Sequence, residues 1–119
     1  MEIGKKVWVF ADGDLPPRGE EEPFGHEALM VVNTGDKDAR ICMDLLFENQ
    51  GPKEGILLHV PAERVCCFRM DEPLGEEKYQ IPPGQFAVLI SSNVPVVAVY
   101  GRLDRRKDMA YYPVAGYSV

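Results

Sequence analysis

The segment SSNVPVVAVYGRLDRR, residues 91–106, joins an apolar run directly to a dense group of charges. Residues 94–99 are apolar at nearly every position, a pattern typical of a strand that is covered on both faces. Residues 102–106 then bring arginine and aspartate side chains together over a few positions. We therefore expect a buried strand whose end enters a polar pocket.

Short strands account for most of the remaining sequence. In ARICMDLLFE, Ile41, Met43 and Leu45 fall on one face of an extended chain, whereas Arg40 and Asp44 fall on the other. Turn-forming sequences separate such runs: DGDLPPRG, NTGDKD, ENQGPKEG, VPAE, DEPLGEE, PPGQ and SSNVP. The pattern predicts an all-β, antiparallel β-sandwich of about eight strands, forming one domain over residues 1–119. The only helix that we expect is a short one over residues 102–112.

Two apolar runs predict self-association. Residues 86–90 and 94–99 leave no polar face, yet a two-layer sandwich of this size covers only one face of each sheet. Contiguous exposed apolar surface is uncommon on soluble monomers. We therefore expect a second copy of the chain to cover the outer face, giving a homo-oligomer. The alternative is a set of exposed valines that only reflects strand propensity.

Charge and composition exclude several classes of protein. The net charge of −6 argues against nucleic acid as the partner, because such partners require a basic surface. No apolar stretch of about 18 residues and no signal-peptide pattern occurs, which predicts a cytoplasmic protein. The cysteines Cys42, Cys66 and Cys67 lack metal-ligand or redox spacing, so we expect reduced, packed thiols, with a redox sensor as the alternative.

A row of polar side chains is the first candidate site. If the strand continues past residue 100, Tyr100, Arg102 and Asp104 share one face at intervals of roughly 7 Å. A phenol, a guanidinium and a carboxylate in sequence suit a polyhydroxylated ligand or a small anion. The alternative is an ordinary surface ion pair between Arg102 and Asp104.

Enzyme chemistry has little support. His26, Glu27 and His59 are the candidate ligands of a cupin-like metal site, but two histidines so far apart in sequence are a poor ligand set. No GxSxG elbow and no phosphate-binding glycine loop occurs. We therefore expect no catalytic site, no metal and no cofactor.

Several segments resemble the sensory rhodopsin transducers, a family of small prokaryotic proteins. The segments that carry the resemblance occur in the family order: Trp8, the prolines at 16 and 17, HE at 26 and 27, NTGDKDA, VPAERVCCFR, IPPGQFAVLISSNVPVV and RLD at 102–104. The resemblance implies a sandwich or jelly-roll-like fold, a tetramer in the cytoplasm and no catalytic site. It also implies either a carbohydrate-like small-molecule ligand or a photoreceptor partner in the membrane.

Residues that match the family segments, together with Tyr100, give a predicted ligand pocket: His26, Glu27, Arg64, Arg69, Asn93, Tyr100, Arg102 and Asp104. The main hypothesis is a module that binds and senses a sugar-like molecule. The alternative is an adaptor that binds a membrane receptor, for which the acidic residues Glu20, Glu21 and Glu22 in the 12–25 loop are the candidate contacts.

Overall fold

All eight strands that the structure contains pair in antiparallel fashion. The structure, a computed structural model, describes residues 2–106 and 108–119. The strands are β1 (Lys5–Asp14), β2 (His26–Asn33), β3 (Ala39–Phe47), β4 (Lys53–Val60), β5 (Arg64–Arg69), β6 (Gln85–Asp104), β7 (Ala110–Val114) and β8 (Gly116–Ser118). The prediction of an all-β sandwich fold with about eight strands is confirmed.

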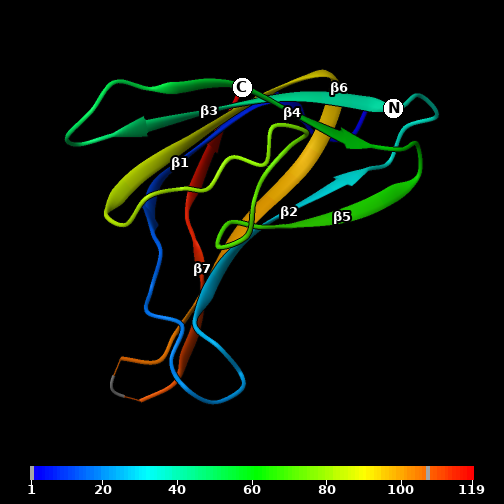
Figure 1. Cartoon of the computed structure of the whole chain (residues 1–119). Helices are drawn as coiled ribbons and strands as arrows, with labels where there is room; N and C mark the ends of the chain where they lie inside the picture. Colours follow the sequence, from blue (N-terminus) through cyan, green and yellow to red (C-terminus); the bar gives the residue numbers. More distant parts are fainter. Residues whose placement is uncertain (1, 107) are drawn as a thin grey trace.

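One long strand belongs to both layers. The first half of β6 lies between β3 and β1 in the order β4-β3-β6-β1-β8, which we call the first sheet. Its second half lies between β2 and β7, and β5 adds to β2, which gives the second sheet. Figure 1 shows β6 crossing from the upper layer to the lower part of the molecule.

The sequence SSNVP is part of β6, which corrects the predicted turn. The register along β1 shifts between the pairs Val7↔Ser91 and Lys5↔Val96, so the intervening residues form an irregularity in the ladder. Here Asn93 accepts a hydrogen bond from the Arg40 amide at 2.7 Å. Turn-forming residues are thus used to redirect a continuous strand from one sheet to the other.

The core lies between the sheets. The period of two in β3 is confirmed, because Ile41, Met43 and Leu45 are buried and Arg40 is exposed. β6 keeps the same alternation on both sides of its irregularity, so even-numbered residues from Phe86 to Arg102 point inward. The inward side chains with almost no exposed surface include Leu29, Val31, Ile41, Met43, Leu45, Ile56, Val88, Ile90 and Tyr100.

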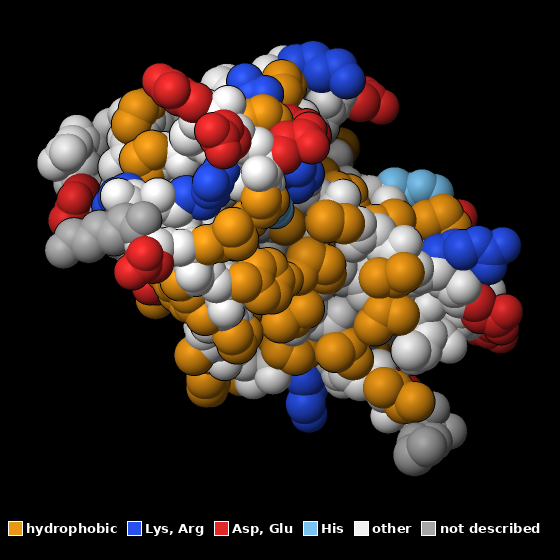
Figure 2. All heavy atoms as spheres, turned by 90° about the horizontal axis from the view of Figure 1, so that it is seen from below, with side chains coloured by type: hydrophobic (Ala, Val, Ile, Leu, Met, Phe, Trp, Pro, Cys, Tyr) orange, Lys and Arg blue, Asp and Glu red, His pale blue; other side chains and the backbone are white. Residues whose placement is uncertain are grey.

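The outer face of the second sheet is apolar over most of its length. Its outward side chains are Met30, Val32, Val65, Cys67, Val97, Val99, Tyr111 and Pro113. Val65 and Tyr111 are 65% and 70% exposed. Figure 2 shows hydrophobic side chains gathered on the lower side of the molecule, where this sheet lies. A single chain therefore exposes the outward residues of the 94–99 run, whereas the 86–90 run lies in the first sheet with Ala87 and Leu89 half-buried.

Two other expectations need correction. The predicted helix over 102–112 is absent: β6 ends at Asp104 and β7 begins at Ala110, and Lys107 between them lies outside the described residues. Alternation explains the difference, because Tyr112 and Val114 face inward while Tyr111 faces outward. Of the three cysteines, Cys42 and Cys66 are half-buried, but Cys67 is exposed rather than packed.

Candidate functional site at the loop end of the sandwich

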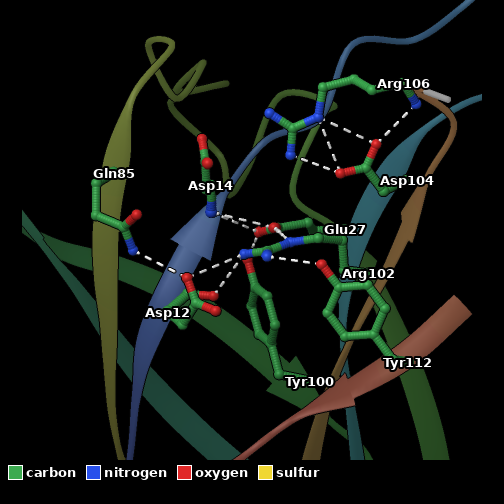
Figure 3. A network of polar contacts seen from close by, with 9 residues as sticks. All are labelled: Asp12, Asp14, Glu27, Gln85, Tyr100, Arg102, Asp104, Arg106 and Tyr112. Carbon is green, nitrogen blue, oxygen red and sulfur yellow. Dashed lines mark hydrogen bonds and ion pairs between the residues drawn. The ribbon is translucent and has the colours of Figure 1, made fainter. Parts of the chain in front are cut away.

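A carboxylate lies inside the sandwich near the end at which the β1–β2 and β6–β7 loops meet. Glu27, the second residue of β2, has no exposed surface. Its carboxylate accepts hydrogen bonds from Tyr100 Oη and Arg102 Nε, both at 2.5 Å, and from the Asp14 amide at 3.1 and 3.2 Å (Figure 3). A buried charge is tolerated only with such partners.

Arg102 extends this network to β7 and adds a second contact with β1. Its side chain is 7% exposed. Nη1 donates to the Tyr112 hydroxyl at 2.9 Å, and Nη2 donates to the Asp12 carbonyl at 2.8 Å and the Asp12 carboxylate at 3.2 Å. Gln85 Nε2 donates to the same Asp12 oxygen at 3.1 Å. The cluster of Asp12, Glu27, Tyr100, Arg102 and Tyr112, which we call the closed cluster, therefore links β1, β2, β6 and β7.

Three groups of the closed cluster, Asp12, Tyr100 and Arg102, have shifted pKa values. Burial, together with the adjacent Glu27 carboxylate, raises the pKa of Tyr100 well above its ordinary value of 10.0, so the hydroxyl stays a donor. Burial lowers the pKa of Arg102, but bonds to Tyr112 and Glu27 outweigh that effect and raise it. Hydrogen bonds from Gln85 and Arg102 lower the pKa of Asp12. Near neutral pH these shifts keep Tyr100 neutral, Arg102 positively charged and Asp12 negatively charged.

The predicted row of Tyr100, Arg102 and Asp104 divides at its last member. Tyr100 and Arg102 point to Glu27, whereas the Asp104 carboxylate pairs with Arg106 at 2.6 Å between Oδ2 and Nη2 (Figure 3). The Arg106 side chain and amide lower the pKa of Asp104. Within the described residues, every buried side-chain nitrogen and oxygen atom has a hydrogen-bond partner. The strand thus ends in a filled cluster, not in an open pocket.

His26 and Arg69 lie together on the other face of the second sheet. Adjacent residues of a strand point to opposite faces, so His26 faces outward where Glu27 faces inward. His26 Nδ1 lies 2.8 Å from the Phe24 carbonyl, and Arg69 donates two hydrogen bonds to Asp71 at 2.7 and 2.8 Å. With Glu22, Pro23 and Phe24 they line an open hollow of about 470 Å³, which we call the His26 hollow.

Arg64 and Asn93 lie away from these two sites. Arg64 pairs with Asn33 at the opposite end of the second sheet, and its Nη1 donates to the Glu63 carbonyl. Asn93 binds the main chain at the start of β3. The residues predicted for one pocket are therefore distributed over separate parts of the structure.

The proposed metal ligands do not meet. His59 pairs with Asp38 at 3.1 Å on the exposed side of β4, far from the interior position of Glu27. Over residues 2–106 and 108–119, no group of three or more metal-binding side chains occurs. A cupin-like metal site built from His26, Glu27 and His59 is therefore inconsistent with this structure.

Sequence reasoning missed Asp12 and Tyr112. Asp12 belongs to ADGD, which resembles a turn, but β1 continues to Asp14. Gly13 explains this, because a Cβ at that position would lie 2.4 Å from the Phe86 ring. The glycine permits close packing within a strand instead of a turn. For Tyr112, the alternation with Val114 was an available signal.

Glu27→Gln is expected to destabilise the fold. The amide keeps the shape of the side chain but leaves Arg102 buried without its main counter-charge, at a cost of about 3 kcal/mol. Urea unfolding monitored by circular dichroism measures this difference. The matched variant Glu22→Gln, on the exposed loop, should shift the free energy of unfolding by less than about 0.5 kcal/mol. Equal stabilities of the two variants would contradict a structural role for the closed cluster.

Comparison with known proteins agrees with this architecture. The sequence matches the family described as Anabaena sensory rhodopsin transducer over residues 3–118. The solved structure of Thermotoga maritima 1070 is 29% identical, with a TM-score of 0.83, covering 98% of this chain and 96% of that one. The Anabaena sensory rhodopsin transducer itself is 34% identical, with a TM-score of 0.77 and coverage of 89% and 94%. No curated protein sequence matches. The chain belongs to the Anabaena sensory rhodopsin transducer family.

Proposed function

We propose that this protein is a signal-transducing adaptor that binds a membrane receptor of the sensory rhodopsin kind and has no catalytic activity. Family membership supports this function. The observation that carries it is the closed cluster: the polar groups expected to bind a ligand are already bonded to one another. This end of the sandwich would then bind a partner through its exposed surface.

The loop from residue 15 to residue 25 is the proposed receptor contact. Glu20, Glu21 and Glu22 are exposed on it. The loop is held in place, because the Gly25 amide donates to the Arg18 carbonyl at 2.7 Å and Arg105 Nη1 donates to the Glu21 carbonyl. Figure 1 shows this loop beside the β6–β7 loop at the lower end of the molecule. The loop therefore presents three adjacent acidic side chains in a fixed position, next to Arg105 and Arg106 of the β6–β7 loop.

Charge complementarity favours a protein receptor over the lipid surface. Cytoplasmic loops of membrane proteins carry an excess of Lys and Arg, whereas the cytoplasmic leaflet is itself anionic. A chain of net charge −6 with three exposed glutamates on this loop is attracted to the first and repelled by the second. The proposal therefore places the protein in the cytoplasm. No helix in the described residues is long and apolar enough to cross a membrane.

Neutralising the loop should weaken receptor binding. We expect the triple variant Glu20→Gln, Glu21→Gln, Glu22→Gln to lose about tenfold in affinity for membranes that contain a sensory rhodopsin, measured by co-sedimentation at low salt. The control triple Glu48→Gln, Glu54→Gln, Glu63→Gln makes the same change in net charge on exposed sites elsewhere. If the two triple variants lost the same affinity, the effect would come from net charge alone, and a specific contact through the loop would be contradicted.

The apolar outer face of the second sheet supports assembly of the protein as a tetramer. Val99 pairs with Met30 of β2 on that face, and it is 45% exposed in the single chain. A second copy would remove this surface from water at a gain of roughly 25 cal/mol for each Å² of apolar area. Self-association is thus the proposed state in which the adaptor acts.

A charge on this face should prevent assembly. Val99→Asp is expected to convert the tetramer to smaller species in sedimentation velocity, because the carboxylate would be buried without a partner. Leu46→Asp, at an exposed site on the first sheet, should leave the assembly unchanged. A wild-type protein that stays monomeric at low micromolar concentration would overturn the proposed assembly.

A second candidate function is the sensing of a carbohydrate-like molecule in the His26 hollow. Its volume of about 470 Å³ is within the usual range for ligand sites, and it combines apolar walls from Pro23 and Phe24 with His26 and Arg69. Arg69 still has an Nη1 group that does not bond to Asp71. Such a mixture suits a neutral polyol.

Thermal-shift measurements with sugars, sugar acids and nucleotides test this candidate. A ligand at 100 times its Kd stabilises the folded state by about 2.7 kcal/mol, which raises the melting temperature measurably. His26→Ala should abolish the shift without lowering the stability of the free protein. A flat screen on the intact protein would eliminate the sensing function and leave the adaptor function in place.

A further inference from the structure

β4 and β5 are consecutive in sequence but form the edges of different sheets. In the described residues β4 pairs only with β3, and β5 pairs only with β2. Figure 1 shows the two strands diverging from the turn at 61–63, with the loop that follows β5 between them. A hollow of about 500 Å³ lies here, lined by residues 57–59, 67–69 and 72–76 with Lys78, and we call it the edge groove. It shares Arg69 with the His26 hollow, but its lining includes no residue of the closed cluster or of the 15–25 loop.

The free edge of β5 presents main-chain groups to the edge groove. The Met70 amide donates to the Glu27 carbonyl at 2.9 Å, which continues the ladder with β2 beyond the end of β5. Main-chain groups in an antiparallel pair alternate between the partner strand and the opposite side. Phe68 therefore bonds toward β2, whereas the N–H and C=O groups of Cys67 and Arg69 point away from it. Both residues line the groove.

The edge of β4 faces the same space. A Cβ built at Gly75 would lie 3.6 Å from the carbonyl oxygen and 3.9 Å from the amide nitrogen of Leu57. Cys66 Sγ lies 3.9 Å from the carbonyl oxygen of His59. Leu57 and His59 thus direct main-chain groups toward the loop and β5. No turn or loop main-chain bond in the described residues uses Leu57, His59, Cys67 or Arg69.

We propose that the edge groove binds an extended basic peptide, which adds as a strand along the free edge of β5. Unpaired strand edges that face a side-chain pocket are the structural requirement for this mode of recognition. The lining supplies apolar surface, because it includes Leu57, which is 69% exposed, and Phe68, which is half-buried. An added strand would place alternate side chains against this wall.

Charge selects a basic sequence for the peptide. Glu72 and Glu76 are exposed on the rim and take part in none of the ion pairs of the described residues. The guanidinium of Arg69 is neutralised by Asp71 at 2.7 Å, which leaves Lys78 as the remaining cation of the lining. With a net charge of −6 on the whole chain, lysine or arginine at alternate peptide positions is favoured.

This site goes beyond the proposed receptor contact. An adaptor requires a second surface for the partner to which it passes the signal, and the edge groove is at a different place from the 15–25 loop. Receptor binding can fail while the peptide binds, and the reverse also holds. The two proposals therefore have separate outcomes.

Binding is tested with a fluorescent peptide of alternating lysine and valine, six residues long, on the full chain. Fluorescence anisotropy should show saturable binding, and hydrogen exchange should slow at the amides of Cys67 and Arg69. N-methylation of alternate peptide amides on the bonding side should weaken binding at least tenfold, because it removes the main-chain donors. Replacing lysine by glutamate in the peptide should weaken it to a similar extent. Absence of saturable binding, or equal binding of the N-methylated peptide, would overturn the proposal.

Two sets of variants locate the site. Cys67→Pro removes the amide that faces the groove while keeping the ladder with β2, and proline is tolerated on an edge in this orientation. Its affinity for the peptide should fall at least tenfold, whereas Cys67→Ser should leave the affinity unchanged. The double variant Glu72→Gln, Glu76→Gln should lower the affinity for the basic peptide several-fold and reduce the salt dependence of binding. Unchanged affinity in Cys67→Pro would overturn the proposal, and if that variant does not fold, the N-methylated peptide decides.

Discussion

The burial of the Glu27 carboxylate is the constraint on which the rest of the structure depends. A charge without exposed surface requires compensating groups on every side. Tyr100 and Arg102 supply these groups from the next strand in the second sheet, and the Asp14 amide supplies one from the first sheet. The bonds fix how the two sheets approach each other at the loop end. They also fix where the loops that leave β1 and β6 begin.

The second determinant is the continuity of β6. Because one strand of 20 residues serves both sheets, its even-numbered side chains face one interior along its whole length. The sheets share this strand but separate at their other edges. β4 and β5 therefore diverge although a short turn joins them, and the space between them is filled only partly by the loop that carries Leu74 and Gly75. The edge groove is a geometric consequence of sharing one strand between two layers.

Together these features direct function to the surface. The closed cluster uses its donors and acceptors internally, and the pKa shifts of Tyr100 and Asp12 lead away from neutral pH, so it suits a rigid support more than a reaction centre. The support holds an acidic loop at one end of the molecule. The apolar face of the second sheet and the main-chain edge of β5 offer two other kinds of contact. The chain's membership in the Anabaena sensory rhodopsin transducer family agrees with the proposed adaptor function.

The sequence by itself determined the strands and the direction of their side chains. Alternation assigned Ile41 and Met43 to the core and Arg40 to the surface, because successive side chains of a strand point to opposite faces of the sheet. Composition also identified the apolar runs and the acidic loop. These properties are local, and for that reason they could be predicted without knowledge of the tertiary structure.

Only the tertiary structure decided which distant residues meet. SSNVP has the composition of a turn, but its polar groups bond to β3 and the strand continues. His26 and Glu27 are adjacent in sequence and yet belong to opposite faces, while Arg64 lies at the far end of the sheet. Asp12 and Tyr112 join Arg102 because β1 and β7 align with β6 in one particular register. Register is set by the packing of the whole core, and that information is not present in any single stretch of sequence.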